Sequence, residues 1–196
     1  MHIRLMNKDD AEPVAEVLNH AIGTGVAHFG TIPTDADEVL GDWQRTHELY
    51  PWLIAQSDEG SFVGFAKASS WKSRKAYTWS VESGIYILEG AQGKGVGRLL
   101  YERLFALLTA QGYRIVLAGV SVPNPASERL HETMGMRVVG EISPAGYKLG
   151  RWVSVRLYQK ILAPCDDSIV PGQIRAVDET WASIEHPETP QTQEQP

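Results

Sequence analysis

The chain has 196 residues, of which 43% are hydrophobic and 21% charged, a composition that predicts one globular domain with a sizeable core. A net charge of -6 without a dense run of Lys or Arg argues against a nucleic-acid partner. Cys165 is the single cysteine, which excludes an intramolecular disulfide. No apolar run is long enough to span a membrane, and the N-terminus lacks the apolar core of a signal peptide. We therefore expect a cytoplasmic enzyme or binding domain.

The first half of the chain predicts a strand, two helices and a hairpin, in that order. Residues 2–5 read as a short strand, and Asn7 begins a capping box before a helix. A second capping signature at 34–37 precedes another amphipathic helix. Residues 52–55 and 62–66 predict two strands joined by a turn at Asp58-Glu59-Gly60.

The second half continues with strands and helices in alternation. The patterns predict a long strand at 78–88, a helix ending at Gln111-Gly112, a buried strand at 115–120, a helix opening at Asn124-Pro125, and strands at 136–142 and 152–161. The order β-α-α-β-β-β-α-β-α-β-β indicates the α/β class, with one mixed, twisted sheet of about six to seven strands and helices on both faces.

The composition changes near Pro164, where prolines, acids and glutamines become frequent. We assign 1–163 to the main domain and 164–196 to a C-terminal extension that is partly disordered. Ile174, Val177 and Trp181 can still pack as a short addition, whereas 186–196 reads as disordered.

A glycine-rich turn at 92–97 separates the predicted strand from the helix that follows it. Glycines let a backbone approach a ligand closely, and the first turn of a helix offers free N–H groups, so the segment suits a pyrophosphate. A P-loop would need Ser or Thr after Lys94, and a dinucleotide fingerprint would need different glycine spacing. A plain glycine turn without a ligand stays open at this point.

The pattern Gln-x-x-Gly-x-Gly, from Gln92 to Gly97, resembles the acetyl-coenzyme A (acetyl-CoA) loop of the GNAT N-acetyltransferase family. Residues 124–136 resemble the late segment of that family, in which an Asn precedes a helix. Residues 50–53, 71–83 and 145–152 look like the phosphinothricin and methionine sulfoximine N-acetyltransferase branch. The similarity runs from about residue 2 to 162.

This resemblance implies the GNAT fold, a homodimer without metal, and acetyl transfer from acetyl-CoA to the α-amino group of a small amino acid-like acceptor. The backbone of strand residues 85–87 would pair with the pantetheine amides, as an added strand would. The implied cofactor-binding residues are Ile85, Tyr86, Ile87, Gln92, Gly93, Lys94, Gly95, Val96, Gly97, Arg98 and Asn124.

Glu82 is our candidate general base, because a protonated amine must lose a proton before it can attack a thioester. Glu is uncommon inside strands, and burial there would raise its pKa toward neutrality. By alternation Glu82 shares a face with Gly84 and Tyr86. A surface carboxylate on a strand edge is the alternative.

His131 occupies the position at which relatives place a proton donor for the departing thiolate, and a packed His without chemistry is the alternative. Asn124 can serve as a helix cap and as a cofactor ligand through different atoms.

Cationic and aromatic side chains are the candidates for binding the acceptor. A guanidinium grips a carboxylate or phosphinate with two hydrogen bonds, while solvated charge or plain packing are the alternatives. The implied acceptor-binding residues are Phe29, Lys72, Arg74 and Tyr77. Two other functions stay open, a GNAT enzyme for a different amine, such as another amino acid, a polyamine or a protein N-terminus, and a non-catalytic acyl-CoA-binding module.

Overall fold

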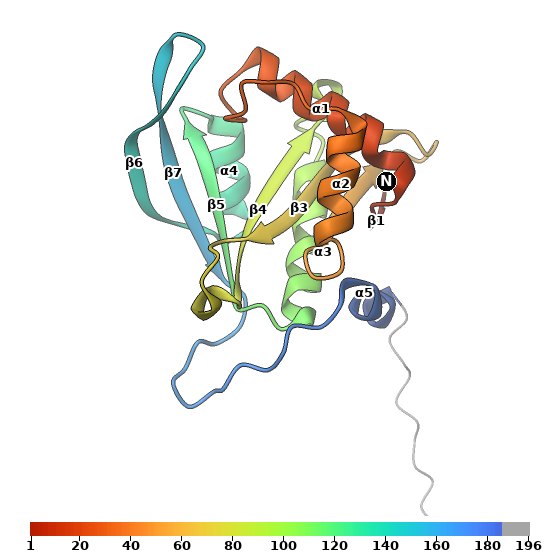
Figure 1. Cartoon of the computed structure of the whole chain (residues 1–196), viewed down its shortest axis with the longest axis vertical. Helices are drawn as coiled ribbons and strands as arrows, with labels where there is room; N and C mark the ends of the chain where they lie inside the picture. The colour runs from red at the N-terminus through yellow and green to blue at the C-terminus, as the bar shows by residue number, and fades with distance from the viewer. Residues whose placement is uncertain (186–196) are drawn as a thin grey trace, which may run out of the picture.

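The computed structural model, described here for residues 1–185, contains one seven-stranded sheet (Figure 1). The strand order is β1-β2-β3-β4-β5-β7-β6, and β4 with β5 is the one parallel pair in this part of the chain. The sheet confirms the predicted mixed α/β class. The strands are β1 His2–Leu5, β2 Trp52–Gln56, β3 Phe62–Ser70, β4 Ser80–Ile87, β5 Ile115–Val122, β6 Arg137–Lys148 and β7 Arg151–Ile161.

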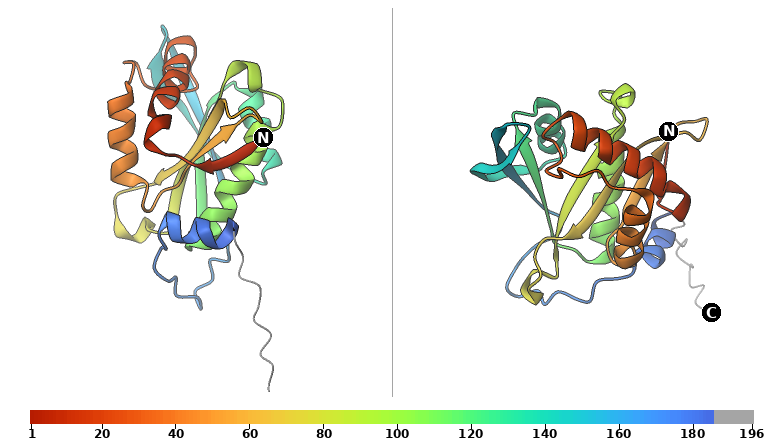
Figure 2. Two further views of the ribbon diagram at one scale, coloured as in Figure 1. Left: turned by 90° about the vertical axis from the view of Figure 1, so that its right-hand side faces the viewer. Right: turned by 45° about the horizontal axis from the view of Figure 1, so that its top comes forward.

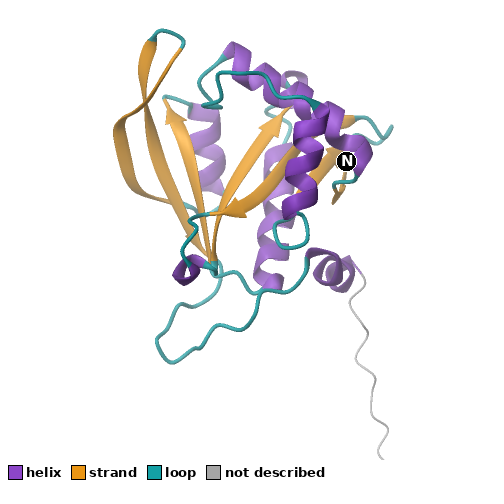
Figure 3. Ribbon diagram, in the orientation of Figure 1, coloured by secondary structure: helices purple, strands orange, loops and turns teal. Residues whose placement is uncertain are grey.

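Helices cover both faces of the sheet, as expected (Figures 1 and 2). Helices α1 (Ala11–Thr24) and α2 (Ala36–Thr46) lie on one face, and α3 (Val96–Gln111) and α4 (Pro125–Thr133) lie on the other. Figure 3 shows the short α5 (Val177–Glu185) beside the lower end of α3. Within residues 1–185, no helix is long and apolar enough to cross a membrane.

Alternation along the strands divides the buried residues into two cores. On β2, Trp52 and Ile54 pack with the α1 and α2 side, whereas Leu53 and Ala55 pack with α3. The first four residues of β2 are all apolar and are therefore buried on both faces of the sheet.

The helix boundaries follow capping chemistry. Asn7 makes the predicted capping box with Asp10, although it first caps a short 3-10 turn that leads into α1. Helix α2 is capped by Asp35, whose Oδ1 accepts from the Glu38 N–H at 2.9 Å, so the cap lies one residue after Thr34. Gly112 ends α3 with φ 106°, the left-handed conformation that glycine adopts at little cost.

The described part of the extension, residues 164–185, packs against the lower end of α3, and we call it the strap. The Gln111 Nε2 group is buried and donates to the carbonyls of Leu49 (2.9 Å) and Arg175 (2.8 Å). The Arg175 N–H donates to the Gln111 carbonyl at 2.9 Å, and the Val177 N–H donates to that of Glu48. The chain thus returns to the domain after β7, while the segment 186–196 that we predicted as disordered lies outside the described residues.

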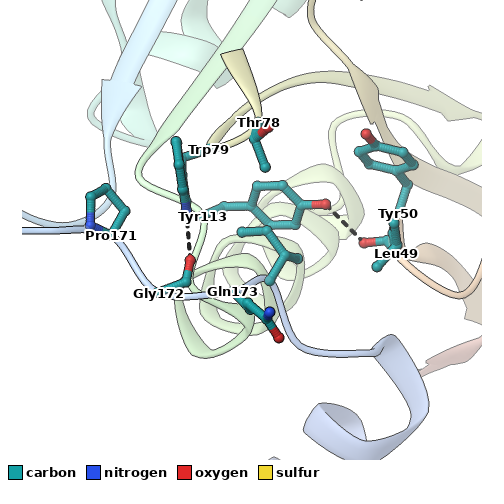
Figure 4. Close-up of a pocket in the computed structure, with 9 residues that line it drawn as sticks. Leu49, Tyr50, Thr78, Trp79, Tyr113, Pro171, Gly172 and Gln173 are labelled. Carbon is teal, nitrogen blue, oxygen red and sulfur yellow. Dashed lines mark hydrogen bonds between the residues drawn. The ribbon is translucent and has the colours of Figure 1, made fainter. Parts of the chain in front are cut away.

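A cavity of about 330 Å³ separates this strap from the domain (Figure 4). Its wall is largely aromatic, with Tyr50, Trp79 and Tyr113 on one side and 171–174 on the other. The Trp79 indole donates to the Gly172 carbonyl at 2.8 Å and the Tyr113 hydroxyl to that of Leu49 at 3.2 Å.

Replacing Gln111 tests how strongly the strap is held. Gln111→Met keeps the volume but removes the buried amide that donates to the Leu49 and Arg175 carbonyls, so the free energy of unfolding should fall by about 1–2 kcal/mol. Urea unfolding measures this change. Gln44→Met, on an exposed part of α2, is the matched control and should change it by less than about 0.5 kcal/mol. Equal unfolding curves for both variants would show that these contacts contribute nothing.

Candidate active site

The central feature of the site is the separation of β4 from β5. The two strands pair at Ser80↔Ile115, Val81↔Val116 and Glu82↔Leu117, and no later pair is formed between them in the described chain. Beyond Glu82, β4 stays paired with β3, and β5 stays paired with β7 (Figure 1). The facing edge of β4 at 83–87 is therefore free of β5, which gives an extended ligand room to pair with backbone.

The glycine loop, residues 92–98, follows the open end of β4. After the 3-10 turn η3 (Glu89–Ala91), Gly93 (φ 73°) and Gly95 (φ 83°) take left-handed conformations, and α3 begins at Val96. The Gln92 side-chain amide donates to the Ile87 carbonyl at 3.2 Å and ties the loop to the strand. The first N–H groups of α3 have no partner within the helix, so this turn suits a pyrophosphate.

Gly97 fixes how closely α3 approaches the sheet. A Cβ at this position would lie 2.9 Å from Leu130 Cδ2 and 3.1 Å from Ile87 Cδ1. The helix start is therefore packed between β4 and α4. Arg98 turns to the surface, where its Nε donates to Glu102 Oε1 at 2.7 Å, and Lys94 is exposed.

Glu82 lies at the last residue of β4 that pairs with β5, and its side chain is half-buried. An ideal Cβ at Gly119 would lie 3.9 Å from Glu82 Oε1, so the carboxylate reaches across the opening toward β5. Burial raises the pKa of Glu82, and the nearby Lys72 partly offsets the rise. Burial also raises the pKa of Tyr86 on the same face to about 12, with a further contribution from Glu82.

His131 is buried on α4, and both its ring nitrogens have partners. Nδ1 lies 2.7 Å from the Ser127 carbonyl, which can only accept, so Nδ1 carries the proton. Nε2 lies 3.0 Å from the Tyr101 hydroxyl and accepts from it. The Ser83 hydroxyl donates to the same Tyr101 oxygen at 3.3 Å, so hydrogen bonds connect α4 with β4 next to Glu82. Burial lowers the pKa of His131, which keeps the ring neutral.

Asn124 caps α4, its Oδ1 accepting from the Ser127 N–H at 3.2 Å. The cap uses the side-chain oxygen and leaves the side-chain nitrogen out of the cap, so the cofactor-binding role of Asn124 stays a prediction.

The four predicted acceptor-binding residues come from two loops. Lys72, Arg74 and Tyr77 belong to the acceptor loop, residues 71–79, which includes the 3-10 turn η2 (Lys75–Tyr77). Among them Lys72 comes close enough to Glu82 to affect its pKa, while Arg74 is exposed and Tyr77 is 42% exposed. Phe29 belongs to a different segment, the lid loop of residues 25–35, and its ring contacts Gly146 of β6.

The lid loop is tied to the strands that flank the opening. The buried Lys148 ammonium donates to the His28 carbonyl at 2.6 Å, and the Ser121 hydroxyl donates to that of Val26 at 2.6 Å. The His28 ring thereby lies 5.8 Å from the Tyr86 ring.

Sequence reasoning missed three side chains that the fold brings to the site, namely His28, Lys67 and Tyr101. Lys67 and His28 are polar residues in apolar or glycine-rich surroundings, a signal that could have drawn attention to them. Tyr101 has the spacing of a core residue on α3, and nothing in the sequence reveals its contact with His131. Residues 1–185 hold no cluster of three or more His, Cys, Asp or Glu side chains suited to a metal ion.

Comparison with known proteins agrees with this geometry. The model of the acetyltransferase (GNAT) family matches residues 15–136. A phosphinothricin N-acetyltransferase from Streptomyces viridochromogenes is 39% identical over 160 residues, covering 82% of this chain and 87% of the relative. An L-methionine sulfoximine/L-methionine sulfone acetyltransferase from Salmonella typhimurium is 32% identical, covering 81% and 93%.

A solved structure shares the architecture as well. The phosphinothricin acetyltransferase from Sinorhizobium meliloti, in complex with acetyl-CoA, superposes with a TM-score of 0.82 at 30% identity, covering 87% of this chain and 92% of that one. The resemblance read from the glycine loop is confirmed. The chain belongs to the GNAT family and is an acyltransferase whose co-substrate is acetyl-CoA.

Proposed function

We propose that the chain transfers the acetyl group of acetyl-CoA to the α-amino group of a small amino acid-like acceptor, such as phosphinothricin or methionine sulfoximine. The observation that carries this proposal is the half-buried Glu82 carboxylate, located where β4 and β5 part and close to the Lys72 ammonium. The names of the relatives support the acceptor class.

The main chain would hold the co-substrate. The N–H groups of residues 93–98 would bind its diphosphate, and the free edge of β4 at 85–87 would pair with its pantetheine amides. Bound there, the co-substrate supplies an activated thioester carbonyl. Glu82 would take a proton from the acceptor ammonium, the amine nitrogen would bond to the acetyl carbon, and the carbon–sulfur bond would break.

The departing thiolate needs a proton, and we assign its delivery to His131 together with Tyr101. The support is the hydrogen-bonded series from His131 Nε2 through the Tyr101 hydroxyl to Ser83 on β4. In this arrangement the Tyr101 hydroxyl donates to the buried, neutral His131, so to protonate the thiolate it would first turn its hydrogen toward the opening. The sulfur–hydrogen bond would then form as the Tyr101 O–H bond breaks, and the Ser83 hydroxyl, which already donates to the Tyr101 oxygen, would stabilise the resulting phenolate.

A homodimer is part of the proposal, because the β6–β7 hairpin, at the edge of the sheet, carries exposed apolar side chains. Trp152 is 67% exposed and lies 5.5 Å from the Tyr147 ring, with Ile142 and Val138 on the same hairpin each 50% exposed. We call Val138, Ile142, Tyr147 and Trp152 the hairpin patch. An apolar patch at a sheet edge is typical of a surface that pairs with a second copy.

Glu82→Gln tests the base. Thiol release with phosphinothricin and methionine sulfoximine should slow by about 10²- to 10⁴-fold at neutral pH, because the acceptor stays protonated. The loss should shrink at alkaline pH, where free amine forms without a base. In the wild type, turnover should rise with pH through a pKa above the ordinary carboxyl value, as the burial of Glu82 requires.

Thermal unfolding of the same variant is the control for misfolding. Burial raises the pKa of Glu82 in the folded state above its value in the unfolded chain. As pH rises from the unfolded pKa to the folded pKa, Glu82 therefore lowers the free energy of unfolding, because the unfolded chain ionises more easily. Glu82→Gln should therefore melt no lower than the wild type. Full activity of the variant across the pH range would remove Glu82 from the chemistry.

Tyr101→Phe tests the proton delivery. We expect kcat to fall by about 10- to 100-fold with the KM for acetyl-CoA within about twofold, and His131→Ala added to it to cause little further loss. Tyr113→Phe, which also removes a buried hydroxyl but at the far end of α3, should keep kcat. A Tyr101→Phe variant as fast as the wild type would contradict the assignment.

Trp152→Arg tests the dimer. A buried, unpaired charge in an apolar interface should convert the dimer to a monomer, as light scattering coupled to size-exclusion chromatography would show. Val170→Arg, at a 90% exposed apolar position of the strap, is the control and should stay dimeric. A monomeric wild type, or a dimeric Trp152→Arg, would refute the interface.

A further inference from the structure

Lys67 lies on the face of the sheet to which Glu82 and Tyr86 also point. Its two cross-strand neighbours on that face are a tryptophan and a glycine. Lys67 pairs with Trp52 on β2 and with Gly84 on β4. The three positions therefore lie side by side across the sheet, with their side chains on one face. The Lys67 ammonium lies 4.0 Å from the centre of the Trp52 ring, and its side chain is 26% exposed.

Gly84 leaves open space beside this lysine. A Cβ there would meet Tyr86 Cε2 at 3.8 Å and no other atom within 4 Å. Glu82 and Tyr86 flank Gly84 on the same face of β4, two residues away in either direction. Diagonal neighbours in a sheet lie about 7–8 Å apart, so a small molecule over Gly84 can reach from Glu82 to the Lys67 side chain.

The positive charge of Lys67 is only partly compensated. Its nearest carboxylate is Asp42 on α2, at 3.9 Å from Nζ to Oδ2, which is longer than a hydrogen bond. Asp42 is also engaged by Arg45, whose Nη2 lies 2.6 Å from Oδ1. One carboxylate thus faces two cations, and an added anion would complete the balance.

His28, in the lid loop, offers a second donor beside Tyr86, the residue whose ring borders the space over Gly84. The His28 Nδ1 accepts from the Gly30 N–H at 2.9 Å, so in the neutral ring the proton resides on Nε2. Burial, together with the charges of Lys148 and Lys67, lowers the pKa of His28, which places Lys67 in its electrostatic surroundings. Tyr86 stacks on Phe65 with ring centres 5.4 Å apart, and the His28 ring lies tilted against it at 5.8 Å.

We propose that Lys67, with the His28 Nε2–H group, binds an anionic group on the side chain of the acceptor while the acceptor amine lies at Glu82. This inference rests on the proposed function and narrows it. Amino acids whose side chain ends in a carboxylate or a phosphinate are better acceptors than neutral isosteres. The acceptor loop, with Lys72 and Arg74, remains available for the α-carboxylate.

Pairs of acceptors that differ in charge and little in shape test the inference. The pairs are glutamate with glutamine, and phosphinothricin with methionine sulfoximine, each followed by thiol release. For the wild type, kcat/KM should favour the anionic member of each pair. Lys67→Met should reduce kcat/KM for the anionic members by about 10- to 100-fold, mainly through KM, and change the neutral members by less than about threefold.

Two further variants separate charge from packing. Lys67→Arg keeps a cation over Trp52 and should retain the preference for anionic acceptors. Lys8→Met removes an exposed cation far from the sheet centre and should alter neither class. An equal loss for both classes in Lys67→Met, or no loss at all, would reduce Lys67 to a packing role and overturn the inference.

Binding measurements keep the inference apart from the function on which it rests. Calorimetry with the full chain saturated with coenzyme A compares phosphinothricin and methionine sulfoximine as ligands. Turnover without any charge preference would refute the inference alone. If no amino acid is acetylated, the proposed function fails. In that case selective loss of phosphinothricin binding in Lys67→Met would still support the anion site, and unchanged binding would refute it.

Discussion

Strands β4 and β5 pair through three residues and then diverge, and the rest of the site depends on that divergence. Parallel neighbours normally continue their ladder, but here β5 turns to follow β7 through eight residue pairs while β4 keeps its seven pairs with β3. The opening exposes one edge of β4 to a ligand that can satisfy its backbone groups. Glu82 occupies the apex, where partial burial and access to a ligand coincide.

In the proposed site a single strand, β4, borders both substrates, because its side chains alternate between the two faces of the sheet. Ile85 and Ile87 point to the core on the α3 side, where Ile87 lies close to Gly97 at the start of α3. Glu82, Gly84 and Tyr86 point to the opposite face, under α1, α2 and the lid loop. The backbone between them remains available to the co-substrate. One extended segment can therefore align a thioester and an amine without a separate binding domain.

Most of the architecture could be predicted from sequence, since it depends on local signals. Apolar runs and capping residues located nearly every strand and helix, and Gly112 marked the end of α3. The predicted ends of some strands differ from the observed ends, because pairing with other strands sets where these strands begin and end. β4 begins at Ser80 instead of Thr78, and β6 extends to Lys148 because β7 pairs with it beyond Ile142.

The site could be predicted only where a motif follows the chain. Glu82 and the glycine loop that begins at Gln92 lie about ten residues apart in the sequence, so a local pattern can predict both. The contact of Tyr101 with His131 joins residues 30 apart, and Lys148 reaches a carbonyl 120 residues away. Register across the sheet, which sets Lys67 beside Gly84, is likewise a property of the folded chain. These long-range contacts cannot be predicted from the spacing of residues along the chain.

The contact between Phe29 and Gly146 has an evolutionary consequence. A Cβ on residue 146 would lie 2.7 Å from the Phe29 ring, so any larger residue there would displace that ring. Residue 146 belongs to the same hairpin as Tyr147 and Trp152, whose exposed rings lie on its outer surface. If the hairpin is the proposed dimer interface and Phe29 lines the proposed acceptor pocket, mutations that adapt the hairpin to a new neighbour will also reshape the pocket wall, so that selection on assembly and selection on substrate preference act on the same few positions.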